Sequence, residues 1–169
     1  MIQWIGVWLV GISATWLGIG AAREEYWQAR KLDELEQALA ALQRELELAA
    51  VSLPQMLLRL EKQCGGSGGE LFARVRAGME QLEEKTMDQI WREALDQLEP
   101  IDPEGRQCMQ PLGGILGGYG VQEQIQGVET ARRRLDMVRA ECYERAKKQG
   151  KIYSVLGVTG GCFLILLCL

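Results

Sequence analysis

The C-terminal part of the chain joins a charged, amphipathic segment directly to an uncharged one. Residues 121–151 carry charges and place apolar side chains at helical steps of three and four residues, whereas residues 152–169 carry no charge, and no Pro separates the two. As a helix with a rise of about 1.5 Å per residue, the uncharged part would be roughly 27 Å long, close to the thickness of a hydrocarbon core. The pattern predicts one long helix that leaves a helical domain and enters a membrane.

The N-terminus is uncharged as well. Residues 2–22 contain no Lys, Arg, Asp or Glu and are numerous enough to span a bilayer. A secretory signal peptide is the rival interpretation, because the small residues at positions 20–22 resemble a cleavage site; however, no basic residue precedes Trp4, and signal peptides begin with a basic region. The sequence therefore favours a first transmembrane helix over residues 1–22, a domain over 23–151 and a second transmembrane helix over 152–169, continuous with the last helix of the domain.

The charges indicate an orientation for this arrangement. All 19 Lys and Arg and all 23 Asp and Glu lie between Arg23 and Lys151, and basic residues flank both uncharged ends on the inner side only. By the positive-inside rule, the middle of the chain is expected in the cytoplasm and both termini on the opposite side of the membrane. The net charge of −4 gives no reason to expect nucleic-acid binding.

The middle of the chain is predicted to be a small all-α bundle of about six helices, since apolar stripes recur at the helical period and no stretch shows the alternation of a strand. A seam of leucines spaced 3-4-3-4 spans only two heptads, which is short for a freestanding coiled coil, so we expect it to pack inside the bundle. The charges between them are expected to face water, as are the three arginines at 132–134. The seam consists of Leu32, Leu35, Leu39, Leu42 and Leu46.

Helix boundaries are also visible. Ser52 is placed to cap a helix that carries Pro54 in its first turn. The sequence GGSGG at 65–69 is expected to be a flexible connection rather than a phosphate-binding loop, because it follows a helix and lacks the Lys-Ser/Thr of that motif. Thr86 and Gln89 form a capping box ahead of a helix that buries Trp91, and a short helix is expected from Pro103 to Gln110.

The stretch PLGGILGGYG, residues 111–120, is a poor helix former by itself, because each interior Gly costs about 1 kcal/mol relative to Ala. Its apolar residues nevertheless stand at helical steps, so we expect a helix that tertiary contacts stabilise and whose glycines let another backbone approach. A tight turn at 117–120, with Gly at positive φ, would fold it back onto the following helix. The residues that would meet in this hairpin are Leu112, Ile115, Leu116, Ile125, Val128 and Leu135.

Residue types that carry chemistry are sparse. The chain has no His, its five Cys form no CxxC pair, and no nucleophile stands beside a candidate base. We therefore expect no enzymatic activity and no catalytic, metal-ligating or cofactor-binding residues. Two other classes stay open: a membrane-tethered coiled-coil interaction or sensor protein, which would dimerise by the leucine seam alone, and a small transporter subunit, although the uncharged ends lack the charged residues that transporters carry in their spans.

The order of features over nearly the whole chain resembles the stage III sporulation protein AB family of endospore-forming bacteria. Its elements are an N-terminal span followed by Ala22-Arg23, a Leu-rich helix, a helix start at 52–57, the stretch 69–72 and the short helix 86–95. Most specific are Leu116-Gly117, Gln124-Ile125, Lys151-Ile152-Tyr153, Leu156-Gly157 and Gly160-Gly161. The chain departs from the family where Thr-Pro-Leu usually follows a Gly (here 50–54) and at 118–120, which leaves the start of the last cytoplasmic helix open.

The resemblance implies a cytoplasmic domain similar to the F domain of the type II secretion platform. It also implies a non-enzymatic scaffold in the mother-cell membrane around the forespore, part of an oligomeric, secretion-like complex required for endospore formation. Partners would be other stage III sporulation subunits, including an ATPase-like protein. From the patterns and the resemblance together, the candidate packing and interaction residues are Leu35, Leu39, Leu42, Pro54, Trp91, Leu112, Leu116, Gly117, Gln124, Ile125, Val128, Leu135 and Tyr153.

Overall fold

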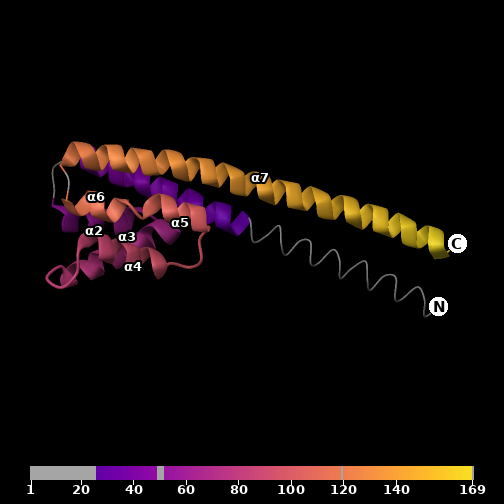
Figure 1. The fold of residues 1–169 in the computed structure, drawn as a ribbon, viewed down its shortest axis with the longest axis horizontal. Coiled ribbons are helices and arrows are strands. Elements are labelled where there is room, and N and C mark those ends of the chain that lie inside the picture. The colour runs from indigo at the N-terminus through magenta and orange to yellow at the C-terminus, as the bar shows by residue number, and fades with distance from the viewer. Residues whose placement is uncertain (1–25, 49–51, 119, 169) are drawn as a thin grey trace. The chain divides into compact units, whose positions relative to one another are not determined.

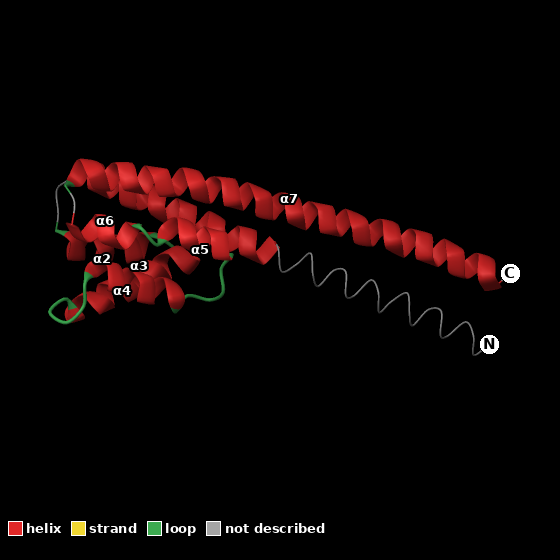
Figure 2. Ribbon diagram, viewed as in Figure 1, coloured by secondary structure: helices red, strands yellow, loops and turns green. Residues whose placement is uncertain are grey.

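The computed structural model describes the backbone of residues 26–48, 52–118 and 120–168, and side chains as far as Lys148. Every regular element among these residues is helical, so the predicted all-α class is confirmed for them (Figures 1 and 2). The elements are a helix over residues 26–48, α2 (Leu53–Gln63), α3 (Gly66–Gly78), a short 3-10 helix η1 (Met79–Gln81), α4 (Met87–Asp96), α5 (Pro103–Met109), α6 (Leu112–Gly118) and α7 (Val121–Cys168).

The chain divides into two compact units. One comprises Arg30–Ala140 and is called the bundle below; the other combines Met1–Ala29 with Glu141–Leu169. Side chains of the second unit are described only near its junction with the bundle, where the rings of Tyr26 and Tyr143 meet edge to face with centroids 6.3 Å apart.

No helix in the part of the chain that the structure describes combines the length and the apolarity needed to cross a membrane. The expected first span, residues 1–22, lies outside the described residues, and so do the side chains of the expected second span, residues 152–169.

The leucine seam forms the centre of the bundle. Each of its five leucines is at most 3% exposed, which confirms that the seam packs inside one chain. It is therefore not available for the dimerisation that a coiled-coil sensor would need. The rest of the core comes from α2 to α7, whose buried apolar residues include Leu57, Leu60, Phe72, Val75, Trp91, Leu95, Met109, Leu112, Val128 and Leu135.

The stretch 65–69 leads directly into α3, and its Gly68 and Gly69 are buried, so the expectation of a flexible connection was wrong. Gly66 begins α3 with φ at +56°, and the Ser67 N–H donates to Glu34 Oε2 at 2.9 Å. A Cβ at Gly68 would lie 2.5 Å from the Cβ of Ala38 and 3.0 Å from the carbonyl oxygen of Glu34. Glycine is needed here because the first turn of α3 lies directly against the helix of residues 26–48.

The predicted helix starts at Ser52 and Thr86 are correct in position, and one of the two predicted side-chain caps is present. Thr86 and Gln89 form the capping box, with both reciprocal hydrogen bonds present. Ser52 occupies the N-cap of α2, yet its side chain makes no capping hydrogen bond. Asp102, which is nearly buried, caps α5 by accepting from the N–H groups of Glu104 and Gly105 at 3.0 and 3.3 Å.

Charged side chains connect α7 to the antiparallel helix of residues 26–48. Arg132 donates to Glu36 Oε1 from two of its nitrogens, at 2.7 and 3.1 Å, and to Gln43 Oε1 at 2.9 Å. Arg139 pairs with Asp33 one to two turns further along. The expectation that the charges face water was therefore wrong for Asp33, Glu36 and Arg132, because the packing of two helices brings opposite charges together at the edge of the core. It is confirmed for Arg133 and Arg134, which are exposed.

Candidate functional site

Helix α6 lies against α4 through its glycine face. A Cβ at Gly113 would lie 2.6 Å from Trp91 Cβ and 2.9 Å from Asp88 Cα, and one at Gly117 would lie 2.6 Å from Met87 Cβ. Trp91, fully buried, donates from Nε1 to the carbonyl oxygen of Met109 at 2.9 Å. These contacts confirm that α6 is a helix whose glycines permit close approach.

The connection from α6 to α7 differs from the predicted turn. Gly117 is inside α6, and the one described glycine with positive φ is Gly66, so positive φ at 117–120 was the wrong reason for these glycines. The two helices do meet: a Cβ at Gly127 would lie 2.7 Å from Ile115 Cδ1, and Gln124 Nε2 donates to the Leu116 carbonyl oxygen at 3.2 Å.

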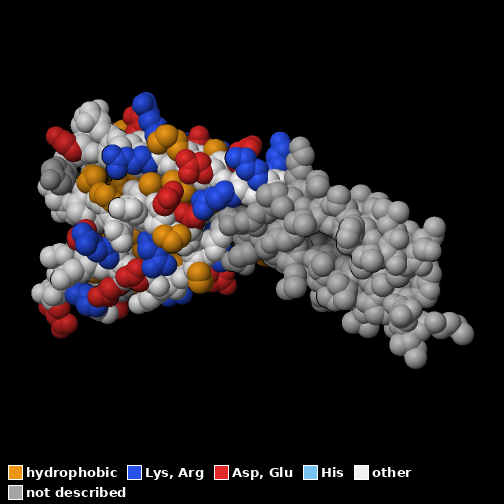
Figure 3. Space-filling view, turned by 45° about the vertical axis from the view of Figure 1, so that its right-hand side comes forward, with side chains coloured by type: hydrophobic (Ala, Val, Ile, Leu, Met, Phe, Trp, Pro, Cys, Tyr) orange, Lys and Arg blue, Asp and Glu red, His pale blue; other side chains and the backbone are white. Residues whose placement is uncertain are grey.

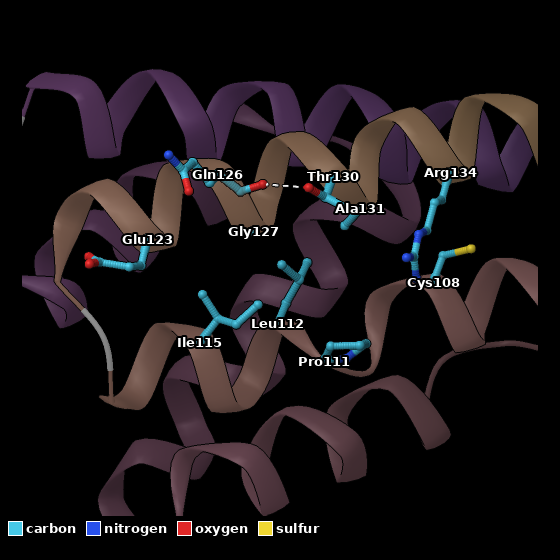
Figure 4. A pocket seen from close by; sticks show the side chains of 10 residues that line it. All are labelled: Cys108, Pro111, Leu112, Ile115, Glu123, Gln126, Gly127, Thr130, Ala131 and Arg134. Atoms are coloured by element: carbon cyan, nitrogen blue, oxygen red, sulfur yellow. Dashed lines mark hydrogen bonds between the residues drawn. The ribbon is translucent and has the colours of Figure 1, made fainter.

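A groove of about 460 Å³ runs between α5 and α6 on one side and α7 on the other (Figure 4). Buried Leu112 and Ala131 form its apolar floor, and half-buried Ile115 lines it where α6 packs on α7 at Gly127. Thr130 on the rim donates to the Gln126 carbonyl oxygen at 2.8 Å, which leaves its methyl group available for contacts. The remaining lining residues are Cys108, Pro111, Glu123 and Arg134.

The two ends of this groove carry opposite charges. Glu123 lies in the first turn of α7, where the helix dipole favours an acid, and Arg134 lies three turns further along. Neither side chain has an ion-pair partner among the described residues. Burial raises the pKa of the Cys108 thiol, an effect that nearby Arg134 opposes, so this cysteine is a neutral thiol at pH 7.

The chemistry of the groove suits binding of an apolar side chain. Within the described part of the chain, no cluster of His, Cys, Asp or Glu could hold a metal ion. A small open groove with an apolar floor, a protonated thiol and single charges at its ends is a surface to which a protein segment can dock.

The structure places the predicted interaction residues in three different environments. Tyr153 is beyond the described side chains. Pro54 and Gly117 are exposed, and Gln124 and Ile125 are half-buried. The others lie in the core and act in packing: Leu35, Leu39, Leu42, Trp91, Leu112, Leu116, Val128 and Leu135.

Sequence reasoning missed most of the groove. The α7 residues that line it stand at helical steps on one face, and the same face continues to Met137, which is 61% exposed. The spacing of this stripe is visible in the sequence. Its residues are mostly small or polar, however, and such a pattern is typical of a solvent-exposed helix face. They are Glu123, Gln126, Gly127, Thr130, Ala131 and Arg134.

A comparison with protein families decides what this bundle is. Residues 3–169 match the model of the family described as stage III sporulation protein AB. The chain belongs to the stage III sporulation protein AB family. The match runs from the uncharged N-terminal stretch to the last residue, so it includes the bundle, the groove and both uncharged ends.

A solved structure titled stage III sporulation protein AB (SpoIIIAB) shares the fold. It superimposes with a TM-score of 0.62 at 18% sequence identity, covering 72% of this chain and 97% of that one. A search of the curated proteins gave no match. Membership of the family supports a role in sporulation, and the structural likeness shows a shared helical fold.

Proposed function

We propose that the chain is a non-enzymatic, membrane-anchored scaffold of a secretion-like channel complex between mother cell and forespore, required for endospore formation. The observation that carries the proposal is the family match over residues 3–169, which covers the helical bundle and both uncharged ends. In this proposal residues 1–22 and 152–169 cross the mother-cell membrane, and the bundle lies in the mother-cell cytoplasm.

The distribution of charge supports the anchoring. Every Lys, Arg, Asp and Glu lies between Arg23 and Lys151, and an uncharged helix of bilayer length does not remain in water without a partner. Backbone groups inside a bilayer need internal hydrogen bonds, which a helix supplies. In keeping with this, α7 runs unbroken from Val121 to Cys168, so it includes almost all of the second uncharged stretch.

The side chains of the bundle support a scaffold. Its polar groups are used between helices, as in the pairs of Arg132 with Glu36 and of Arg76 with Glu61, the latter at 2.6 Å. Short helices packed closely through glycine, such as α6 on α4, give a compact unit with an open surface groove. Such a body can hold partners in register, and we expect these to be other stage III sporulation subunits, including an ATPase-like protein, arranged as on a type II secretion F domain.

A topology experiment tests the anchoring. In a chain without its native cysteines, Glu83→Cys places a thiol on an exposed loop of the bundle, whereas a chain that keeps only Cys168 carries its thiol at the C-terminus. The chain is expressed in non-sporulating cells, where the far side of the membrane faces the medium. A membrane-impermeant maleimide added to these cells while they are intact is expected to label Cys168 and to spare position 83 until the cells are opened. Labelling of position 83 in intact cells would overturn the orientation.

An assembly experiment tests the scaffold itself. In sporulating cells that lack the chain, the other stage III subunits should no longer purify from solubilised membranes as one complex. Expression of the wild-type chain in these cells should restore both the complex and spore formation. Normal spores and an intact complex without the chain would remove the scaffold role.

A further inference from the structure

A second surface of the bundle is complementary to the groove. The turn between η1 and α4 presents Leu82, 46% exposed, followed by exposed Glu83 and Glu84. Neither carboxylate forms an ion pair among the described residues. This turn, called the acidic tip, is the loop at the lower left of Figure 2. An isolated exposed leucine is ordinary, but a leucine beside two unpaired acids can enter an apolar groove with a basic edge.

The groove has such an edge. Arg134 lies on its rim without an ion-pair partner among the described residues, and Arg133, whose side chain is 78% exposed, pairs only with Glu129 in its own helix. Both arginines also border a second hollow, of about 370 Å³, that adjoins the groove along α7. The apolar floor of Leu112 and Ala131, with Ile115 beside it, can receive a branched apolar side chain.

The tip and the groove lie on different sides of α6. The tip leads into α4, which packs on one face of α6 through Gly113 and Gly117, whereas the groove opens between α6 and α7 (Figures 1 and 4). One chain therefore cannot place its own tip in its own groove. A contact between these two surfaces requires two copies.

We propose that the groove binds the acidic tip of a second copy of this chain. Leu82 of one copy lies against Ile115 and Leu112 of the next, and Glu83 and Glu84 face Arg133 and Arg134. Opposite charges across such a contact give it register and specificity, while the leucine supplies apolar burial. The space-filling view shows apolar, basic and acidic side chains interspersed on the face of the bundle that it presents (Figure 3).

The geometry of the contact determines the kind of assembly. Because two different patches meet, each copy still has one free tip or groove, and the contact can repeat from copy to copy. If the chain is anchored as proposed above, all copies stand in the same direction in the membrane, which favours a ring or an arc around an axis perpendicular to it. Only this step rests on the proposed function; the contact itself does not.

A disulfide experiment tests the contact directly, because native Cys108 lines the groove. The full-length chain, with its other four cysteines replaced by Ser, is expressed with two different tags in the same membranes: one form carries Leu82→Cys and C108S, and the other keeps Cys108. Mild oxidation is expected to yield a disulfide between differently tagged copies, mapped by mass spectrometry to positions 82 and 108. Leu58→Cys, at an exposed leucine of α2, is the matched control and should give at least about tenfold less product.

Charge exchange tests the contact without cysteine. The variant E83K/E84K has a basic tip and a basic groove edge, whereas R133E/R134E has an acidic tip and an acidic edge. Each alone should lose self-association in detergent by about tenfold or more. An equal mixture should regain association between unlike copies, because both of the tip-to-groove contacts that two unlike copies can form are attractive. The changed residues are exposed, so helicity measured by circular dichroism should stay at the wild-type level.

The outcomes separate this inference from the proposed function. Equal disulfide yields at positions 82 and 58, no disulfide at all, or association that ignores the charge exchange would overturn the contact. If a helix of another protein occupies the groove, Cys108 will crosslink to that protein and not to position 82, which also overturns it. None of these results would remove the scaffold role, which falls only if the chain is absent from the membrane or dispensable for the complex.

Discussion

Three consecutive arginines of α7 have three different environments. Arg132 is 31% exposed and connects to Glu36 and Gln43 on the neighbouring helix, Arg133 is 78% exposed, and Arg134 lies on the rim of the groove. Successive residues on a helix point about 100° apart, so adjacent identical side chains meet different surroundings. The contribution of each arginine to the stability of the fold therefore depends on the groups around its side chain, because the side chains themselves are identical.

Replacing these arginines by Ala should separate their contributions. Arg132→Ala removes charge-assisted hydrogen bonds at a partly shielded site and is expected to lower the free energy of unfolding by about 1 kcal/mol. Arg133→Ala removes an exposed pair within one helix and should change it by less than about 0.5 kcal/mol. Thermal unfolding of the full-length chain in detergent, followed by circular dichroism, measures both. Equal losses would mean that Arg132 contributes no more than a surface charge.

At the scale of elements, α6 is the helix that depends most on its surroundings. It has seven residues, four of them Gly, and a helix of this length and composition is not stable alone in water. It exists because α4 covers one of its faces closely and α7 approaches another at Gly127. Glycine thus lowers the intrinsic helicity of α6 and at the same time permits the packing that compensates for it.

Two neighbouring glycines of α6 should respond oppositely to the same change. At Gly113 a methyl group would lie 2.6 Å from Trp91 Cβ and 2.9 Å from backbone atom Cα of Asp88, so Gly113→Ala should destabilise the fold by about 1–3 kcal/mol. At Gly114 the nearest atom is Asp88 Oδ1 at 3.8 Å, so Gly114→Ala should stabilise it by about 0.5–1 kcal/mol. The midpoint of thermal unfolding should fall for the first and rise for the second; a rise for both would show that α6 is not packed on α4 in this way.

At the scale of the whole molecule, the bundle of Arg30–Ala140 contains its own core. Its largest buried side chains, such as Trp91 and Phe72, lie within that range. A unit with a core of this kind is expected to fold without the rest of its chain. We therefore expect the uncharged ends to determine the location of the bundle and the bundle to determine which partners bind.

A fragment that lacks both uncharged ends tests this division. Residues 26–151 are expected to be soluble, to give the circular dichroism spectrum of a helical protein and to unfold in one cooperative transition. A Trp91→Phe variant of the same fragment, which loses the hydrogen bond from the indole to Met109, should keep the spectrum and unfold at a lower temperature. A spectrum dominated by strand, or a transition without cooperativity, would show that the bundle depends on the ends.

Local patterns were sufficient to predict the positions of most helices and the buried face of several. The spacing of Leu32 to Leu46, the capping box at Thr86 and the short helix after Pro103 all depend on residues a few positions apart, and each is present in the structure. The confinement of charge to residues 23–151 is likewise visible in the sequence alone. These features are readable because hydrophobic period and capping are properties of neighbouring residues.

Tertiary structure alone decided which of these elements meet. The packing of Gly68 on Ala38, the pairing of Arg132 with Glu36 and the groove between α6 and α7 join residues that are far apart in the chain. A glycine in close contact and a glycine in a loose turn look alike in sequence, and an arginine on a polar face looks solvated until an opposite helix supplies its partner. Close packing across the core gives these residues their roles, since it fixes distances that no local pattern contains.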